Sequence, residues 1–135
     1  MTIYTVYPYC ISEENLAELK TVGIIYTEEK VKLDLKYEDL PTKHSSESDN
    51  HRALKKVAYE MLQNLGDPKP EYEYAYYDVY SHTLGIVVEC GTTQVDKLLE
   101  AFFRWFNLTL KEFWNLDYPN KEGNAELVKF KRQKL

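Results

Sequence analysis

The sequence predicts an α+β fold, in which a central mixed β-sheet is flanked by helices, and three observations support this prediction. Apolar residues recur at helical spacing over His51–Leu65 and again over Thr93–Phe106. Runs rich in β-branched and aromatic residues lie before, between and after these helices, as is typical of strands. A chain of 135 residues can bury a core without a metal ion or a disulfide, so we expect a single domain over residues 1–135.

The composition limits the classes of function. The chain carries 22 acidic and 17 basic residues, which gives a net charge of −5. This balance argues against a protein that coats nucleic acid through electrostatics alone, because neutralising phosphates takes a basic surface. A local basic groove is compatible with it, and Lys129–Lys134 is the densest positive run. No apolar run approaches the roughly 20 residues that span a bilayer, and no signal-peptide pattern is present, so we expect a cytoplasmic protein without a membrane partner.

An N-terminal β-α-β-β elaboration is predicted over residues 1–40, with strands that can extend the sheet of the core. Its expected elements are a strand, a short helix and the two arms of a hairpin, over Ile3–Cys10, Glu13–Lys20, Gly23–Thr27 and Val31–Tyr37. The run Pro41–Asn50 has no apolar residue and many turn formers, so it is predicted to be a surface loop before the core.

The core is predicted over residues 51–135. Helix His51–Leu65 has the clearest apolar stripe, and Asp49 or Asn50 can cap its start. After it we expect a strand, a strand, a helix and two further strands, over Tyr72–Tyr80, Leu84–Cys90, Thr93–Phe106, Leu110–Tyr118 and Glu126–Lys131.

Two acidic residues, Asp78 and Glu89, stand in otherwise apolar or aromatic runs. An ionised carboxylate in a strand as apolar as Leu84–Cys90 is costly unless it is paired or bound to a cation. Because side chains alternate along a strand, an even number of turn residues would put the two acids on one face, and an odd number would separate them. With a turn over His82–Gly85 they would lie directly opposite each other, and with a turn over His82 and Thr83 alone they would be diagonal neighbours.

Two interpretations of this pair follow from the residues. Carboxylates that converge beside the start of a helix make an oxygen-rich pocket of the kind that Mg²⁺ or Mn²⁺ prefers, with waters and a phosphate as further ligands. Alternatively, Asp78 ends a strand, and Glu89 accepts hydrogen bonds from the amides of Thr92 or Thr93 at the helix start.

The runs YYDVYS and GIVVECG, which contain Asp78 and Glu89, together with the helices around them, resemble the PD-(D/E)xK nuclease-like superfamily, related to restriction endonucleases. The common core of that superfamily is α-β-β-β-α-β, with one acid on a central strand and a second acid on the next. The resemblance covers about residues 51–131 and implies a restriction-endonuclease-like core. It also implies magnesium-dependent phosphodiester hydrolysis, in which Asp78 and Glu89 are catalytic residues and metal ligands and a metal-bound water attacks the phosphate.

One position departs from the superfamily pattern. The lysine expected two residues after the second acid is Gly91 here. Some members place a substitute on the following helix, which makes Lys97 and Gln94 the candidate catalytic residues, although an exposed helical lysine is the simpler account of Lys97. Without a substitute, the chain would be an inactive protein of the nuclease fold.

The first functional hypothesis is therefore a metal-dependent nuclease or nuclease-like DNA-processing protein, with nucleic acid as its partner. The alternative is an inactive relative that acts through protein–protein contact, which the acidic charge and Gly91 both favour. A homodimeric binding module is a third hypothesis, because two short elements carry more large aromatic residues than they can easily bury: Phe102, Phe103, Trp105, Phe106, Phe113 and Trp114.

Other residues are given ordinary structural roles. His44, His51 and His82 form no pair at metal-ligand spacing, so turn or surface positions are expected for them. Glu60 borders the apolar stripe of its helix and is expected to face solvent. A group of tyrosines could stack on nucleic-acid bases, but alternating tyrosines are also good strand residues: Tyr72, Tyr74, Tyr76, Tyr77 and Tyr80.

Overall fold

The computed structural model describes residues 3–6, 9–12, 17, 20–21, 23–33, 47–75, 77–91, 100–101, 104–105, 107–108 and 110–133. Its elements are the helix α2 (Glu47–Leu65) and the strands β1 (Ile3–Val6), β2 (Tyr9–Ser12), β3 (Ile24–Lys32), β4 (Glu71–Tyr72), β5 (Val79–Ser81), β6 (Ile86–Cys90), β7 (Glu112–Leu116) and β8 (Asn124–Arg132). Residues 100, 101, 104, 105 and 107 are also helical.

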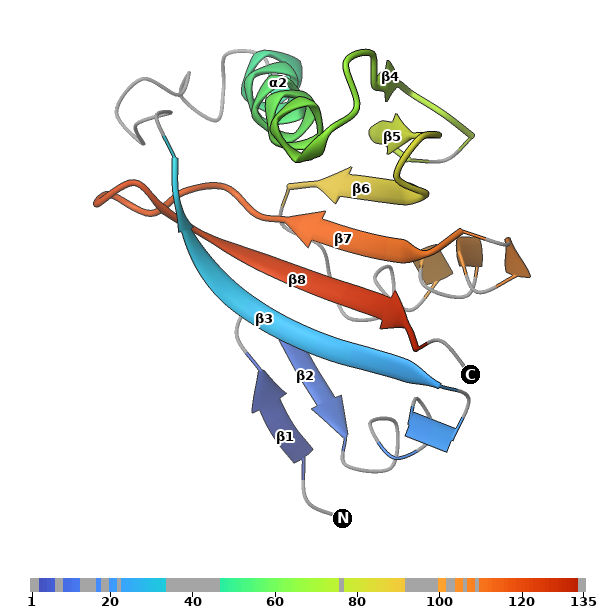
Figure 1. The fold of residues 1–135 in the computed structure, drawn as a ribbon. Helices are drawn as coiled ribbons and strands as arrows, with labels where there is room; N and C mark the ends of the chain where they lie inside the picture. The colour runs from blue at the N-terminus through green and yellow to red at the C-terminus, as the bar shows by residue number, and fades with distance from the viewer. Residues whose placement is uncertain are drawn as a thin grey trace.

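A mixed six-stranded sheet forms the centre of the molecule, in the order β3-β8-β7-β6-β5-β4 (Figure 1). Strands β6 and β7 are parallel, whereas every other neighbouring pair is antiparallel. A parallel pair needs a crossover connection, and the helical residues between 100 and 107 lie in the segment that makes it. The predicted α+β class with a mixed central sheet is confirmed.

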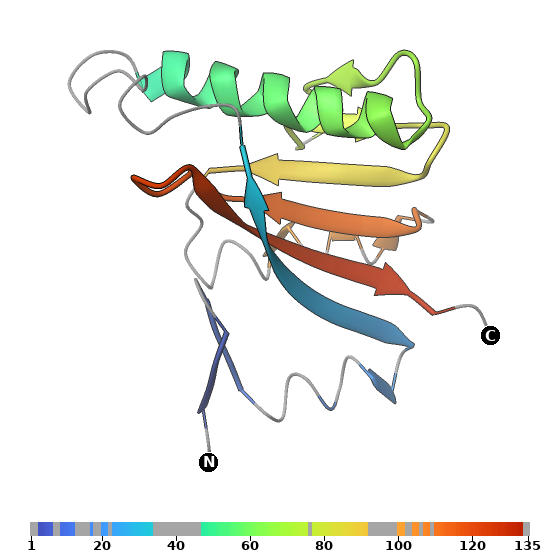
Figure 2. The same cartoon turned by 60° about the vertical axis from the view of Figure 1, so that its left-hand side comes forward.

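Each face of the sheet has its own apolar core. Val88 of β6 and Leu127 of β8 pack with Leu54 of α2 on one face. Val87 and Phe130, one position away on β6 and three on β8, pack with Trp105 of the helical crossover on the other. This is the alternation expected of strands that are covered on both sides. Figures 1 and 2 show that α2 lies over the β4–β6 end of the sheet.

The predicted helix His51–Leu65 is present, but α2 begins earlier, at Glu47. Residues 47–50 are therefore the first helical turn and not the end of a loop. The prediction that Asp49 or Asn50 caps the helix is wrong, because both lie inside it. Leu54 and Leu62 are fully buried, as the apolar stripe requires. The helix ends at Leu65, and the next residue, Gly66, has a φ of 128°, which glycine adopts more readily than other residues.

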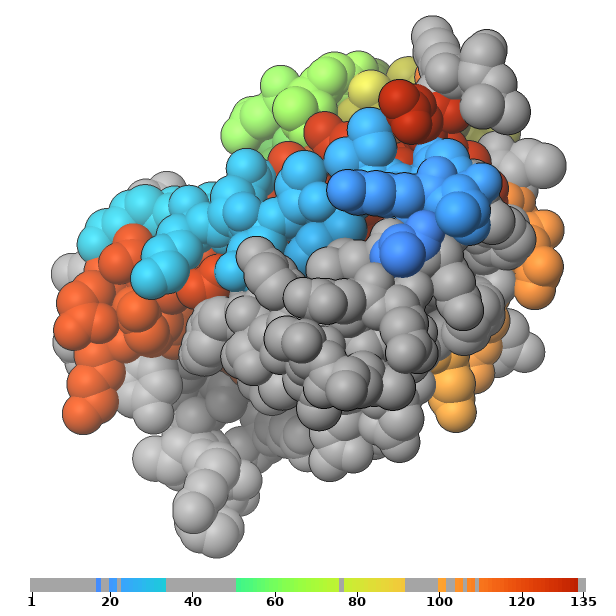
Figure 3. All heavy atoms as spheres, turned by 90° about the horizontal axis from the view of Figure 1, so that it is seen from below, coloured from blue at the N-terminus to red at the C-terminus, as the bar shows by residue number. Residues whose placement is uncertain are grey.

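The N-terminal predictions need correction. Ile3–Cys10 is not one strand, because β1 and β2 form a separate antiparallel pair. The hairpin over Gly23–Thr27 and Val31–Tyr37 is also wrong, since Ile24–Lys32 is one continuous strand that pairs with β8 at nine positions. Its central Glu-Glu-Lys has no residue that favours a turn, so the chain continues to the β7–β8 turn, where the Lys32 amine donates to the Glu122 carbonyl. Figure 3 shows β3 running along the surface to that turn. Of the predicted helix Glu13–Lys20, residues 17 and 20 are described, and both are helical.

The predicted strand Tyr72–Tyr80 is broken into β4 and β5. Glu73 and Ala75 have φ values of 57° and 53°, which take the chain out of the sheet between the two strands. The Tyr77 N–H donates to the Tyr74 carbonyl (2.8 Å), and the Glu73 N–H donates to the Asp78 carbonyl (2.9 Å), so a compact loop precedes Asp78. Within the described residues, no helix is long and apolar enough to cross a membrane.

Candidate functional site

The β5–β6 hairpin brings the two predicted acids together. Four residues, His82–Gly85, separate β5 from β6, and the ladder pairs Val79 with Val88. The same register one residue further would place Asp78 opposite Glu89. The turn thus has the even length that the acid pair requires.

Asp78 stands where the regular ladder ends. Its N–H donates to the Val88 carbonyl (3.0 Å), while its Oδ2 accepts from the Cys90 N–H (2.8 Å). The carboxylate thus replaces a main-chain acceptor at the end of β6. The same oxygen lies 3.1 Å from Nε2 of His51, which comes from the first turns of α2. Asp78 is therefore oriented by groups from both the sheet and the helix.

Glu89 meets Asp78 through a hydrogen bond between the two side chains. The pKa of Glu89 is raised from 4.5 to about 9. Burial is the main cause, and the hydrogen bond with Asp78 and the negative charge of Asp78 also contribute. Two carboxyl groups can share a hydrogen bond only if one of them carries a proton. The two carboxyl groups therefore share one proton, and burial favours Glu89 as the group that holds it.

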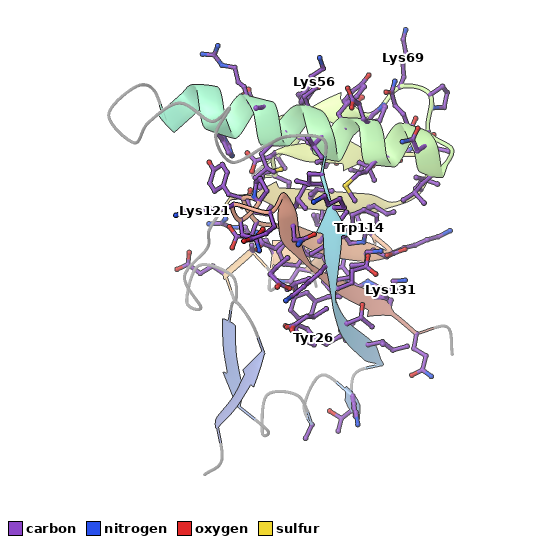
Figure 4. The ribbon with its side chains drawn as sticks, turned by 90° about the vertical axis from the view of Figure 1, so that its left-hand side faces the viewer. Tyr26, Lys56, Lys69, Trp114, Lys121 and Lys131 are labelled. Carbon is purple, nitrogen blue, oxygen red and sulfur yellow. The ribbon has the colours of Figure 1, made fainter. Side chains whose placement is uncertain are left out.

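Lys55 brings a cation to the same place from α2. Its side chain is buried, and its Nζ lies 2.9 Å from Oε1 of the exposed Glu73. The charge of Lys55 lowers the pKa of both Glu89 and Cys90, against the larger effect of burial. The neighbouring Lys56 points away from the sheet instead (Figure 4).

The opposite face contributes Arg104 and Tyr77. The Tyr77 hydroxyl donates to the Ala101 carbonyl (2.8 Å), which ties the acid-bearing loop to the helical crossover. Burial and the nearby Glu89 raise the pKa of Tyr77, whereas the charge of Arg104 lowers the pKa of both groups. The charges of Lys55 and Arg104, which come from helical segments on the two sides of the sheet, thus both act on Glu89.

Gly91 explains why no lysine can follow Glu89 in the expected place. Its φ is 103°, and a Cβ atom there would lie 3.4 Å from the ring of Tyr118. The Asn115 side chain also donates to the carbonyls of Glu89 (3.1 Å) and Gly91 (3.4 Å), which fixes the chain at this turn. Any side chain at position 91 would be strained.

The structure does not describe the other predicted catalytic residues. Lys97 and Gln94 lie outside the described residues, as do Thr92 and Thr93 of the structural interpretation. Glu60 faces solvent, as expected. Asp78 itself does more than end a strand, since its carboxylate is bound on two sides.

Sequence reasoning missed His51 and Lys55. His51 was expected in an ordinary turn or surface role, and Lys55 was not singled out. A signal was present, because His51, Lys55, Ala58 and Leu62 recur at spacings of four, three and four and so share one face of α2. Ala58 and Leu62 are buried, and the two polar residues continue their stripe past the end of the apolar core.

The donor set is small. Among the residues that the structure describes, no group of three or more His, Cys, Asp or Glu side chains is placed to hold a metal ion. Within the described part of the chain, the carboxyl groups of Asp78 and Glu89 are thus the candidate protein ligands. Comparison of the chain with family models, with curated proteins and with solved structures gave no match.

Proposed function

We propose that this protein is a divalent-cation-dependent phosphodiesterase that acts on nucleic acid, with Asp78 and Glu89 as its cation ligands. The observation that carries the proposal is the hydrogen bond between these two carboxyl groups, together with the charge of the buried Lys55 that acts on Glu89. The order of elements supports it. From α2 onward the chain runs through β4, β5, β6, helical residues and β7, which is the α-β-β-β-α-β order implied by the resemblance to PD-(D/E)xK proteins.

The carboxyl pair fits a small, hard cation. Mg²⁺ commonly takes one or two protein carboxylates and completes its octahedron with waters and substrate phosphate, so a third protein ligand is not needed. When bound, Mg²⁺ or Mn²⁺ would supply an activated water and stabilise charge on the phosphate. The proton shared by Asp78 and Glu89 would have to leave, which couples cation binding to pH.

Other residues of the site have supporting roles in this proposal. His51 and the Cys90 N–H hold the Asp78 carboxylate in place. Lys55 supplies the positive charge that the superfamily pattern places two residues after the second acid, but from the preceding helix. Such a charge would stabilise the negative charge that develops on the phosphate.

A second function, a non-cleaving binding protein, is favoured by one observation. The polar groups of the site already have partners within the chain, since Asp78 binds His51 and Cys90 while Lys55 binds Glu73. In this alternative the cluster closes the end of the β5–β6 hairpin, and the protein acts through contact with a partner protein or a second copy.

Thermal unfolding during titration with Mg²⁺ or Mn²⁺ separates the two functions. A cation site predicts that the wild type gains stability with the cation and that Glu89→Ala does not. Labelled DNA and RNA, in single-stranded and duplex form, should be cleaved by the wild type under the same conditions and left intact by Glu89→Ala. If neither cation changes the unfolding temperature of the wild type and no strand is cleaved, the phosphodiesterase proposal is wrong.

A further inference from the structure

A cavity opens at the turn of the β5–β6 hairpin, at the opposite end of the hairpin from the acid pair. Its volume is about 420 Å³, which lies in the range of small-ligand sites. Its lining combines aromatic, apolar and cationic side chains with main chain from the hairpin turn: Tyr74, Tyr80, His82, Thr83, Gly85, Leu108, Leu110 and Lys111.

One wall of the cavity is a pair of stacked tyrosines. The rings of Tyr74 and Tyr80 are 3.9 Å apart between centroids and inclined by 19°. Tyr80 is buried, but Tyr74 is 38% exposed, so its ring is open to a further flat group. The left-handed residues Glu73 and Ala75 flank Tyr74 and turn it onto Tyr80. Backbone strain of this kind persists only where the surrounding structure holds it.

The opposite wall is held by Arg132. Its guanidinium donates to the carbonyls of Leu108 (2.6 Å) and Leu110 (2.7 Å), which line the cavity. The floor is fixed as well, because the Gly85 carbonyl accepts from the Lys111 N–H (2.8 Å). A preformed site of this kind avoids much of the ordering cost of binding.

We propose that this cavity binds one unpaired nucleobase of a single-stranded nucleic acid. The base would extend the Tyr74–Tyr80 stack, and every base has a face that can do so. Lys111 provides a cationic group for an adjoining phosphate, which a purely apolar ligand would not need. The Tyr80 hydroxyl and Nδ1 of His82 are 2.8 Å apart, so the imidazole is held beside the aromatic wall.

This inference rests on the proposed function for the identity of the ligand and names its substrate class. Asp78 and Tyr80 are two residues apart, or roughly 7 Å along an extended chain. The aromatic wall that would hold the base therefore lies close to the carboxyl pair along the chain. The hypothesis favours single strands because a base within a duplex cannot leave its stack without cost.

Binding is measured in EDTA, without cleavage, by fluorescence anisotropy with labelled oligothymidylate of about eight nucleotides, a typical site size for single-stranded binders. Tyr74→Ala should weaken binding about 10-fold or more, and Tyr74→Phe should stay within about 2-fold of the wild type, because it keeps the ring. Tyr72→Ala is the matched control. Tyr72 is also exposed (48%) and stacked, but on Tyr59 and outside the cavity.

Lys111→Gln should weaken binding and reduce its dependence on salt, as expected for a phosphate contact. A duplex of the same sequence should bind less tightly than the single strand, and oligouridylate tests whether RNA is accepted equally. Photocrosslinking of an oligonucleotide with 5-bromouracil to the wild type should label Tyr74 or Tyr80. This measurement remains informative if the alanine variant does not fold.

Equal affinities for wild type and Tyr74→Ala, an equal loss in Tyr72→Ala, or crosslinks only outside the cavity would overturn the inference. The absence of single-strand binding by the wild type would do the same. The proposed function fails separately. If binding follows this pattern but no cation supports cleavage, the nucleobase site is supported and the phosphodiesterase proposal is wrong. If the wild type cleaves nucleic acid and Tyr74→Ala cleaves it equally well, the phosphodiesterase proposal is supported and the nucleobase site is wrong.

Discussion

His51 lies with its Nε2 3.1 Å from Oδ2 of Asp78, so the first turns of α2 are joined directly to the carboxylate that ends the β5–β6 ladder. This contact comes from a residue 27 positions earlier in the chain. The same Oδ2 accepts from the Cys90 N–H, so one oxygen of Asp78 is held by both the helix and β6.

His51→Ala should therefore weaken cation binding by about 10-fold, because Asp78 loses one of the two groups that orient it. His51→Gln, which keeps a hydrogen-bond donor, should recover most of the affinity. The measurement is the Mg²⁺ or Mn²⁺ concentration at half-saturation of the thermal shift. His82→Ala, in the hairpin turn away from the acids, is the control and should leave this concentration unchanged.

Lys55→Met should reduce phosphodiesterase activity by about 10²-fold or more, since the variant lacks the positive charge beside the acid pair. The substitution keeps most of the aliphatic length, and the salt-bridge partner that it leaves is the exposed Glu73, so little stability should be lost. Lys56→Met is the neighbouring control, because that side chain points to solvent. Equal activity in the two variants would show that Lys55 has no part in catalysis.

The stability of the cation-free protein should fall as the pH rises from about 5 to about 9. The pKa of Glu89 is about 9 in the folded protein and 4.5 ordinarily, so the folded state holds a proton in this window that the unfolded state has lost. Below this pH range Glu89 is protonated in both the folded and the unfolded state, so the two states no longer differ in bound protons and stability no longer changes with pH through this group. Urea unfolding at a series of pH values measures the slope. Glu89→Gln, which cannot ionise, should flatten it, whereas an unchanged slope would place the cause elsewhere.

Gly91→Lys, which restores the superfamily pattern, should lower stability by roughly 1–3 kcal/mol, because position 91 has a left-handed φ. No gain in activity is expected. Gly91→Ala should cost a similar amount, and Gly66→Ala is the control for strain alone, since nothing lies within 4 Å of a Cβ built there. Urea denaturation compares the three variants, and a stable, more active Gly91→Lys would contradict this account of the site.

Local signals were enough to predict parts of the fold and the acid pair. The apolar stripe predicted α2, and the turn residues between two apolar runs predicted the β5–β6 hairpin. Given that hairpin, alternation along the strands predicted that Asp78 and Glu89 can meet. Each of these inferences depends on residues that are close together in the sequence.

The missed features depend on distant partners or on unusual backbone. The continuous strand β3 pairs along its whole length with β8, about 100 residues later in the chain. The local sequence does not identify that partner, so the predicted hairpin was wrong. The break after β4 occurs at Glu73 and Ala75, which both have left-handed φ values. Because neither residue is a glycine, the sequence contains no signal for this break. His51 and Lys55 continue a stripe whose other members are apolar, and only the fold shows that this end of the stripe faces two acids.

The pairing of β3 with β8 also has a consequence for synthesis on the ribosome. Residues 24–32 emerge early, but the strand against which they hydrogen-bond in this sheet is made only with residues 124–132. Until then β3 cannot form its nine-residue ladder, and its closure over so long a segment carries a large loop entropy. We therefore expect the β5–β6 hairpin, which bears the acids, to acquire structure before the sheet is complete. Strand β3 should be added to the sheet last.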